Sequence, residues 1–115
     1  MSVTVRSRSN AEYYVWGDGC DGWHLLKSDR LSVIEERVPP GCGETRHRHA
    51  HAQQCFYVLE GEAVIELEGQ EFLLCAGESL EVPAGAAHQF FNRSYFDVRF
   101  LVVSQPATRG DRQAV

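Results

Sequence analysis

Turn-forming residues recur at short intervals along this chain of 115 residues, and their spacing constrains its fold more than any other feature. Glycine, proline, aspartate and asparagine are frequent at these positions because they adopt the backbone angles of tight turns. Short strands separated at such regular intervals are typical of a sandwich or a closed barrel. The turn groups are Gly17-Asp-Gly19, Asp21-Gly22, Ser28-Asp29, Pro39–Gly43, Gly61, Gly69, Gly77, Pro83-Ala-Gly85 and Asn92-Arg-Ser94.

Most runs between these turns are rich in Val, Ile, Leu, Phe and Tyr, which favour strands. The alternation is clearest where Ala63, Ile65 and Leu67 share one face of a segment. No segment has a sustained helical period, so we predict an all-β domain. The polar tail from Pro106 to Val115 is predicted to be frayed. The predicted strands are Glu12–Trp16, His24–Lys27, Leu31–Val38, Thr45–His49, Cys55–Leu59, Glu62–Glu68, Gln70–Cys75, Ser79–Val82, His88–Asn92 and Phe96–Val103.

Size and charge exclude several classes of protein. The length suits one domain, only just large enough for a useful core. A formal net charge of -5 gives no general attraction to nucleic acid or to an anionic membrane. The N-terminus lacks the apolar core of a secretory signal, and no stretch approaches the roughly 18 apolar residues that span a bilayer. We therefore predict a cytoplasmic protein that binds neither nucleic acid nor membrane.

The four cysteines fit the same compartment. Cys20, Cys42, Cys55 and Cys75 form no Cys-x-x-Cys pair, so the sequence holds neither a zinc knuckle nor a redox motif. In the cytoplasm thiols stay reduced. We expect four free cysteines that act as packing residues.

Histidines are concentrated in one short run. His47, His49 and His51 lie within six residues, and residues two apart on a strand face the same side. His47 and His49 would therefore present both imidazoles to one ion, with at least a third ligand from elsewhere. A histidine-rich surface strand is the alternative interpretation.

The spacing around these histidines resembles that of a known superfamily. The stretch Gly41-x5-His47-x-His49-x4-Gln54-x6-Gly61 resembles the first motif of the cupins. The stretch Gly77-x5-Pro83-x-Gly85-x2-His88-x3-Asn92 resembles the second. The resemblance covers the chain from about Pro39 to Phe100, and two motifs in the right order make it specific.

This resemblance implies both a fold and a metal site. The fold is a double-stranded β-helix, a jelly-roll barrel, with N-terminal strands over about 11–38 and a core over about 39–103. By the same resemblance, His47, His49, Gln54 and His88 bind a divalent transition metal such as Zn, Fe, Mn, Ni or Co. His51 is a rival ligand if the strand continues that far.

Gln54 departs from the usual cupin pattern, in which many members have a metal-binding glutamate. A neutral amide leaves the double charge of the ion uncompensated. We expect a stronger Lewis acid, better at holding hydroxide or an anionic, enolate-like substrate. In the alternative, Gln54 hydrogen-bonds a metal-bound water, and three histidines alone hold the ion.

Apolar residues on the ligand-bearing strands predict the lining of a pocket. If Gln54 and His88 face inward, so do Phe56, Val58 and Phe90, and Phe100 shares the inner face of the last strand with Phe96. With His51 at the mouth, such a lining suits a small, partly apolar organic ligand. Ordinary core packing is the alternative.

The residues support two classes of function. The first is a metal-dependent enzyme that acts on a small organic substrate by dioxygenase-like or isomerase-like chemistry. The second is a non-catalytic cupin that binds a small molecule or a metal, such as a sensor, because one fold hosts many functions. Aromatic residues in the N-terminal third, like those through which small cupins pair, also predict a homodimer. We expect these residues near the interface or capping the barrel; they are Tyr13, Tyr14, Trp16 and Trp23.

Overall fold

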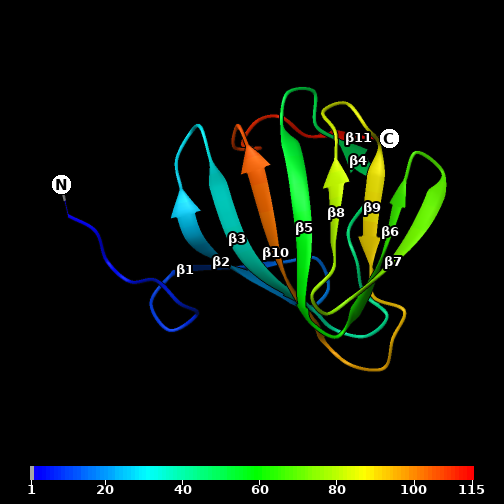
Figure 1. The fold of residues 1–115 in the computed structure, drawn as a ribbon, viewed down its shortest axis with the longest axis horizontal. Coiled ribbons are helices and arrows are strands. Elements are labelled where there is room, and N and C mark those ends of the chain that lie inside the picture. The colour runs from blue at the N-terminus through cyan, green and yellow to red at the C-terminus, as the bar shows by residue number, and fades with distance from the viewer. Residues whose placement is uncertain (1) are drawn as a thin grey trace.

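A computed structural model describes residues 2–115, which form two antiparallel sheets that face each other (Figure 1). These residues contain no helix, and so none that is long and apolar enough to cross a membrane. The strands are β1 (Glu12–Trp16), β2 (Cys20–Lys27), β3 (Ser32–Val38), β4 (His47–Arg48), β5 (Gln53–Glu60), β6 (Glu62–Leu67), β7 (Gln70–Cys75), β8 (Ser79–Val82), β9 (His88–Phe91), β10 (Val98–Gln105) and β11 (Gln113–Ala114).

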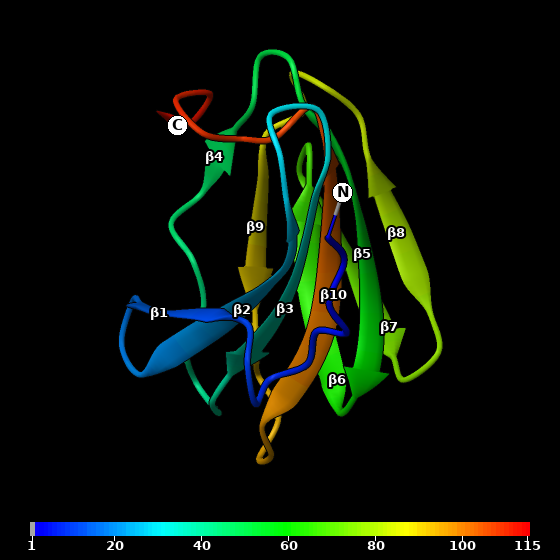
Figure 2. The ribbon, with the colours of Figure 1, turned by 90° about the vertical axis from the view of Figure 1, so that its left-hand side faces the viewer.

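The order of the strands confirms the predicted jelly-roll fold. One sheet has the order β1-β2-β3-β10-β5-β8, and the other has the order β11-β4-β9-β6-β7. Strand β10 therefore returns to lie between β3 and β5, while β9 lies between β4 and β6. Figure 2 shows the strands β3, β10, β5 and β8 side by side in this order. Hydrogen bonding does not close the sheets into a continuous barrel, so the domain is a two-sheet sandwich.

The inner faces of the sheets enclose a core rich in aromatic rings. Phe90 and Phe100 stack with their ring centroids 4.1 Å apart. Phe56 packs against both rings and also contacts His88, whose ring centroid lies 6.1 Å away. Alternation along β9 and β10 buries these residues while their neighbours face outward. Phe56 therefore separates the aromatic core from the histidines.

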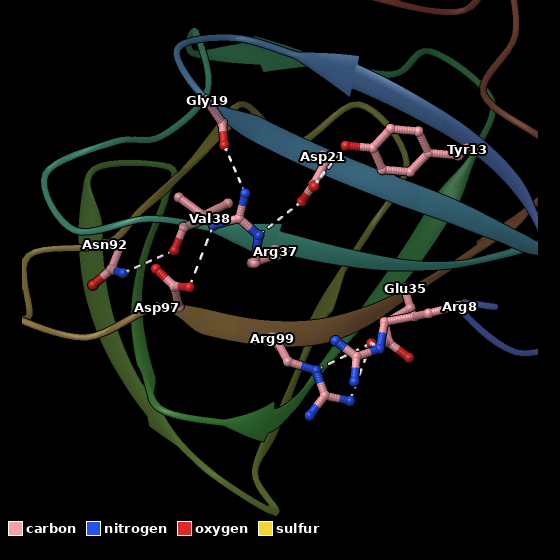
Figure 3. A network of polar contacts seen from close by, with 10 residues as sticks. All are labelled: Arg8, Tyr13, Gly19, Asp21, Glu35, Arg37, Val38, Asn92, Asp97 and Arg99. Atoms are coloured by element: carbon pink, nitrogen blue, oxygen red, sulfur yellow. Dashed lines mark hydrogen bonds and ion pairs between the residues drawn. The ribbon is translucent and has the colours of Figure 1, made fainter.

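Ion pairs and hydrogen bonds tie the first strands to β10 and to the loop before it (Figure 3). The guanidinium of Arg37 on β3 contacts Asp21 on β2 at 3.0 Å and Asp97 at 3.3 Å. On β10, Arg99 pairs with Glu35 at 3.1 Å. Tyr13 on β1 donates to Asp21, which brings the N-terminal hairpin into the same network. These contacts hold β1 and β2 against the rest of the sheet.

The predicted strand beginning at Phe96 is wrong at its start. The side chain of Asn92 accepts from the backbone N–H of Ser94 and donates to the carbonyl oxygens of Phe96 and Val38. This side chain holds residues 92–96 in a turn, because an asparagine can replace the backbone partners of a strand. Phe96 is consequently 77% exposed and does not face the interior. Strand β10 begins at Val98 instead.

The C-terminal segment is ordered, so the prediction of a frayed tail is wrong. We call residues 106–115 the C-terminal strap. It carries β11, which pairs with β4 through Gln113 and Arg48 and through Ala114 and His47 (Figure 2). The carboxylate of Asp111 accepts three hydrogen bonds from the backbone N–H groups of residues 50–52. These contacts fasten the strap to the loop that follows β4.

The cysteines are free, but they are not all packing residues. Cys20 is fully buried and Cys42 half-buried, whereas Cys55 and Cys75 are exposed. The packing prediction is therefore wrong for the last two, because both occupy outward-facing positions of their strands.

Candidate metal centre

Three histidines from two strands and a loop converge between the sheets. His47 is on β4, His49 follows that strand, and His88 is on β9, where it pairs directly with His47. One ligand atom from each ring lies within 4.8 Å of the others. All three side chains are buried. The structure therefore brings together the three histidines that were predicted from the sequence to be metal ligands.

Hydrogen bonds fix the orientation of each ring. Nδ1 of His47 lies 2.8 Å from the carbonyl oxygen of Thr45, and Nδ1 of His88 lies 2.9 Å from that of Ala86. Nδ1 of His49 lies 2.5 Å from the carbonyl oxygen of Asp111. A carbonyl oxygen only accepts, so each Nδ1 carries the proton and each Nε2 keeps its lone pair. This arrangement is usual for histidines that bind a metal.

Electrostatics favour the same neutral form. Burial lowers the pKa of His47 to about 4, although its hydrogen bond to Thr45 opposes the shift. Burial also lowers the pKa of His49 and that of His88. Neutral imidazole is the form that binds metal ions. Nε2 of His88 is buried without a hydrogen-bond partner among the described residues. The three rings thus fit a metal ion chemically.

Gln54 on β5 contributes an oxygen to the same region. Its Nε2 donates to the hydroxyl of Ser104 on β10 at 3.0 Å. Its Oε1 is buried and has no partner within residues 2–115. Three neutral imidazoles therefore fit a metal ion, and the neutral amide of Gln54 lines the same cavity as His47 and His49. Ser104 was missed from sequence, because only the β5–β10 register places it opposite Gln54.

A cavity of about 230 Å³ opens beside these groups. Ile34, Phe56 and Val102 form its apolar wall, and Trp16 and Thr108 also line it. Its polar lining includes His47, His49, Gln54, Ser104, Tyr14, Glu36, Glu44 and Arg112. A cavity of this kind, apolar with a few convergent polar groups, is typical of a small-molecule site.

Two buried carboxyl groups in this cavity were missed by the sequence analysis. Oε2 of Glu44 lies 3.9 Å from Nε2 of His47, and its Oε1 accepts from the backbone N–H of Phe90. Burial raises the pKa of Glu44 to about 8. Glu36 on β3 accepts from the hydroxyl of Tyr14, and burial raises its pKa to about 7. Both pKa values suit proton transfer near neutral pH.

The predicted pocket residues divide into two groups. Phe56 lines the cavity, whereas Val58, Phe90 and Phe100 belong to the packed core. His51 is exposed on the loop after β4, where its backbone N–H is bonded to Asp111. Strand β4 ends at Arg48, so the alternation that would turn His51 inward does not continue. The prediction that Val58, Phe90, Phe100 and His51 line the pocket is therefore wrong, because the first three are core residues and His51 is exposed.

The N-terminal aromatics also divide. Tyr14 and Trp16 line the cavity, while Tyr13 and Trp23 contact each other with ring centroids 5.5 Å apart. The first pair therefore covers the site, and the pairing of two chains through these residues stays a prediction.

Comparison with known proteins agrees with this geometry. Residues 34–104 match the family model of the cupin domain. An oxalate-binding protein of Thermotoga maritima is 30% identical over 85 residues, covering 70% of this chain and 70% of that protein. The quercetin 2,3-dioxygenase of Bacillus subtilis is 33% identical over 64 residues, covering 56% of this chain and 19% of that protein.

A solved structure supports the fold over nearly the whole chain. The polyketide cyclase RemF from Streptomyces resistomycificus has a TM-score of 0.86 at 22% identity, with 99% of this chain and 86% of that chain covered. Matched regions span from 16% to 70% of the lengths of the curated relatives. The family match, the fold and the histidine cluster together show that this chain belongs to the cupin superfamily.

Proposed function

We propose that this chain is a metal-dependent enzyme that moves a proton on a small, oxygen-rich substrate in an isomerase-like reaction. The observation that carries the proposal is the position of Glu44. Its carboxyl group lies 3.9 Å from Nε2 of His47, in the wall of a cavity that His47, His49 and Gln54 also line. A proton-transfer group is thus placed directly beside the candidate metal centre.

His47, His49, His88 and Gln54 would hold the ion. A divalent metal there supplies a Lewis acid that polarises a carbonyl oxygen of the substrate and stabilises the negative charge that develops on it. The four protein groups are neutral, so they do not cancel the charge of the ion. This supports chemistry in which the substrate becomes more negative.

The remaining polar groups have separate tasks. Glu44 is fixed by the N–H of Phe90 and can exchange a proton with the substrate. Glu36 and Tyr14 form a hydrogen-bonded pair on the cavity wall. The apolar wall of Ile34, Phe56 and Val102 limits the access of water. A cavity of about 230 Å³ restricts the reacting part of the substrate to a small molecule.

The test begins with the metal content of the purified protein, before and after incubation with Zn, Mn, Fe, Co and Ni salts. The loaded protein is then incubated in D2O with 2-oxo acids and keto sugars, and proton NMR measures exchange at the carbon next to the carbonyl. Oxygen uptake is recorded with diketones and phenols. We expect bound metal, exchange with at least one substrate and no oxygen uptake.

The matched variants are Glu44→Gln and Glu62→Gln. Glu62 is exposed on β6, so its substitution should leave exchange unchanged. Glu44→Gln should keep the metal and lose exchange. Substrate-dependent oxygen uptake without exchange would make the protein a dioxygenase instead, and metal binding with neither activity would make it a binding protein. A protein that takes up no metal would overturn the proposal.

Gln54→Ala tests the fourth position separately. We propose that its amide oxygen contacts the ion, so the variant should bind metal more weakly by several-fold to about tenfold, at the lower end of what outer-shell partners contribute. Unchanged affinity would show that the three histidines hold the ion alone.

A further inference from the structure

Arg112 lies beside the candidate metal centre, although it comes from the end of the chain. The C-terminal strap brings it to the cavity wall, next to β4, which carries the lining residue His47. Its Nη2 donates to the carbonyl oxygen of Thr45 at 3.3 Å. The same oxygen accepts from Nδ1 of His47. One carbonyl thus connects the guanidinium to a candidate ligand.

The charge of Arg112 has no carboxylate partner within residues 2–115. The two nearby acids have other donors, since Glu36 accepts from Tyr14 and Glu44 from the N–H of Phe90. Its charge nevertheless acts on the cavity, because it opposes the rise in the pKa of Glu36. An unpaired guanidinium presents a planar fork of donors that matches a carboxylate.

Trp16 carries a second donor in the wall of the same cavity. Nε1 of Trp16 is buried and has no hydrogen-bond partner in the described part of the chain, and its side chain lines the cavity. An indole N–H only donates, so a buried one requires an acceptor. The cavity wall therefore carries an exposed guanidinium without a carboxylate partner and a buried indole N–H without an acceptor, both within residues 2–115.

We propose that Arg112 and the N–H of Trp16 bind a carboxylate group of the substrate, which assigns the substrate to the small carboxylic acids. The inference rests on the proposed function, because it places this carboxylate in the cavity beside the metal. The C-terminal strap is then part of the substrate site, and Arg112 sets its specificity for charge.

The test compares two probes that differ in charge and hardly in shape. Isothermal titration calorimetry measures the binding of pyruvate and of the neutral pyruvamide to zinc-loaded protein and to metal-free protein. The variants are Arg112→Gln, Arg112→Lys and Trp16→Phe. Arg109→Gln is the matched control, because Arg109 belongs to the same strap but lines a different groove. Elemental analysis gives the zinc content of every sample.

Arg112→Gln should weaken pyruvate binding by about 10- to 100-fold, as expected for a hydrogen bond to a charged group, and leave pyruvamide within about twofold. Arg112→Lys should recover part of the loss, Trp16→Phe should lose several-fold, and Arg109→Gln should match the wild type. Equal affinity of the wild type for both probes, or binding of neither, would overturn the inference. So would an Arg112→Gln variant with full zinc content and unchanged pyruvate affinity.

Failure of the proposed function would look different. A wild type without zinc would overturn the metal-dependent reaction, while the preference for pyruvate and its dependence on Arg112 would still be measured on the metal-free protein.

Discussion

The space between the two sheets contains two regions of opposite character, with Phe56 between them. On one side Phe90 and Phe100 stack among aliphatic side chains, and each is 1% exposed. On the other side lie three equally buried imidazoles and an amide, with Nε2 of His88 and Oε1 of Gln54 unsatisfied. Burial of apolar surface stabilises a fold, whereas burial of unpaired polar atoms costs free energy. The first region therefore stabilises the structure, and the second has the unpaired polar atoms that a binding site offers to a ligand.

The largest effect is expected in the aromatic region. Phe100→Ala removes a ring that packs against two others, so the free energy of unfolding should fall by about 3–5 kcal/mol. Urea unfolding of the metal-free protein measures it. Phe96→Ala is the matched control, because that ring is 77% exposed and its loss should change stability by no more than about 0.5 kcal/mol. If Phe100→Ala lowers the free energy of unfolding by less than about 1 kcal/mol, the aromatic region does not stabilise the fold more than the histidine region does.

The histidine region should respond in its binding of metal and less in its stability. His88→Ala removes one of three candidate ligands, and the affinity for zinc should fall by more than about 100-fold, beyond the usual effect of outer-shell partners. A competition titration with a chromophoric chelator measures this affinity. The metal-free variant should unfold at a higher urea concentration than Phe100→Ala.

His51→Ala provides the control for His88→Ala and also tests the rival ligand. Since His51 is exposed on the loop after β4, zinc affinity should stay within about twofold of the wild type. A loss as large as that of His88→Ala would place His51 in the metal site.

The buried acids add a dependence of stability on pH. Burial raises the pKa of Glu36 from 4.5 to about 7, so the folded state prefers the protonated carboxyl group. Its contribution to stability is complete below about pH 4.5 and is lost as the pH rises to 7. In metal-free protein the difference in unfolding free energy between wild type and Glu36→Gln should therefore decrease by about 2 kcal/mol between pH 5 and pH 8.

Urea unfolding at four pH values in this range gives that difference. Glu81→Gln, at an exposed position of β8, should show no such trend. A difference that stays constant with pH would mean that Glu36 is ionised throughout the range.

These two regions were predictable from sequence to different degrees. His47, His49 and His88 could be found because their spacing relative to turn residues is a local pattern that the resemblance to cupins made specific. Glu44 could not, because it precedes the strand predicted over 45–49, and only its contacts with Phe90 on β9 and with His47 show that its side chain reaches the cavity.

The strap was missed for a different reason. Residues 106–115 are polar and carry no strand-like alternation, yet β11 pairs with β4, more than 60 residues earlier in the chain. What orders the strap is a long-range partner, the loop of residues 50–52 that bonds to Asp111. The composition of a segment does not indicate a partner so far away in the sequence. Residues 106–115, including Arg112, were therefore predicted to be frayed.

The strap also distinguishes one ligand from the other two. His47 and His88 are each oriented by the carbonyl oxygen two residues earlier, whereas His49 is oriented by that of Asp111, 62 residues later. We therefore expect the ring of His49 to depend most directly on the strap and the ring of His88 to be insensitive to it, while His47 touches the strap only through the pairing of β4 with β11 and through the carbonyl that Thr45 shares with Arg112. Asp111→Ala removes the carboxylate that fastens the strap while leaving the backbone carbonyl in place.

For Asp111→Ala we expect the smallest of these effects, a decrease in zinc affinity of about tenfold, the lower end for an outer-shell partner. The ¹⁵N–¹H spectrum of the zinc-loaded protein should show a shifted or exchange-broadened Nδ1–H signal for His49, a smaller change for His47 and an unchanged signal for His88. Arg109→Ala, in the same strap without that carboxylate, should alter neither property. Equal broadening of all three ring signals would mean that the strap supports the whole site. The position of the orienting carbonyl, two residues earlier or in the strap, would then make no difference to the stability of the site.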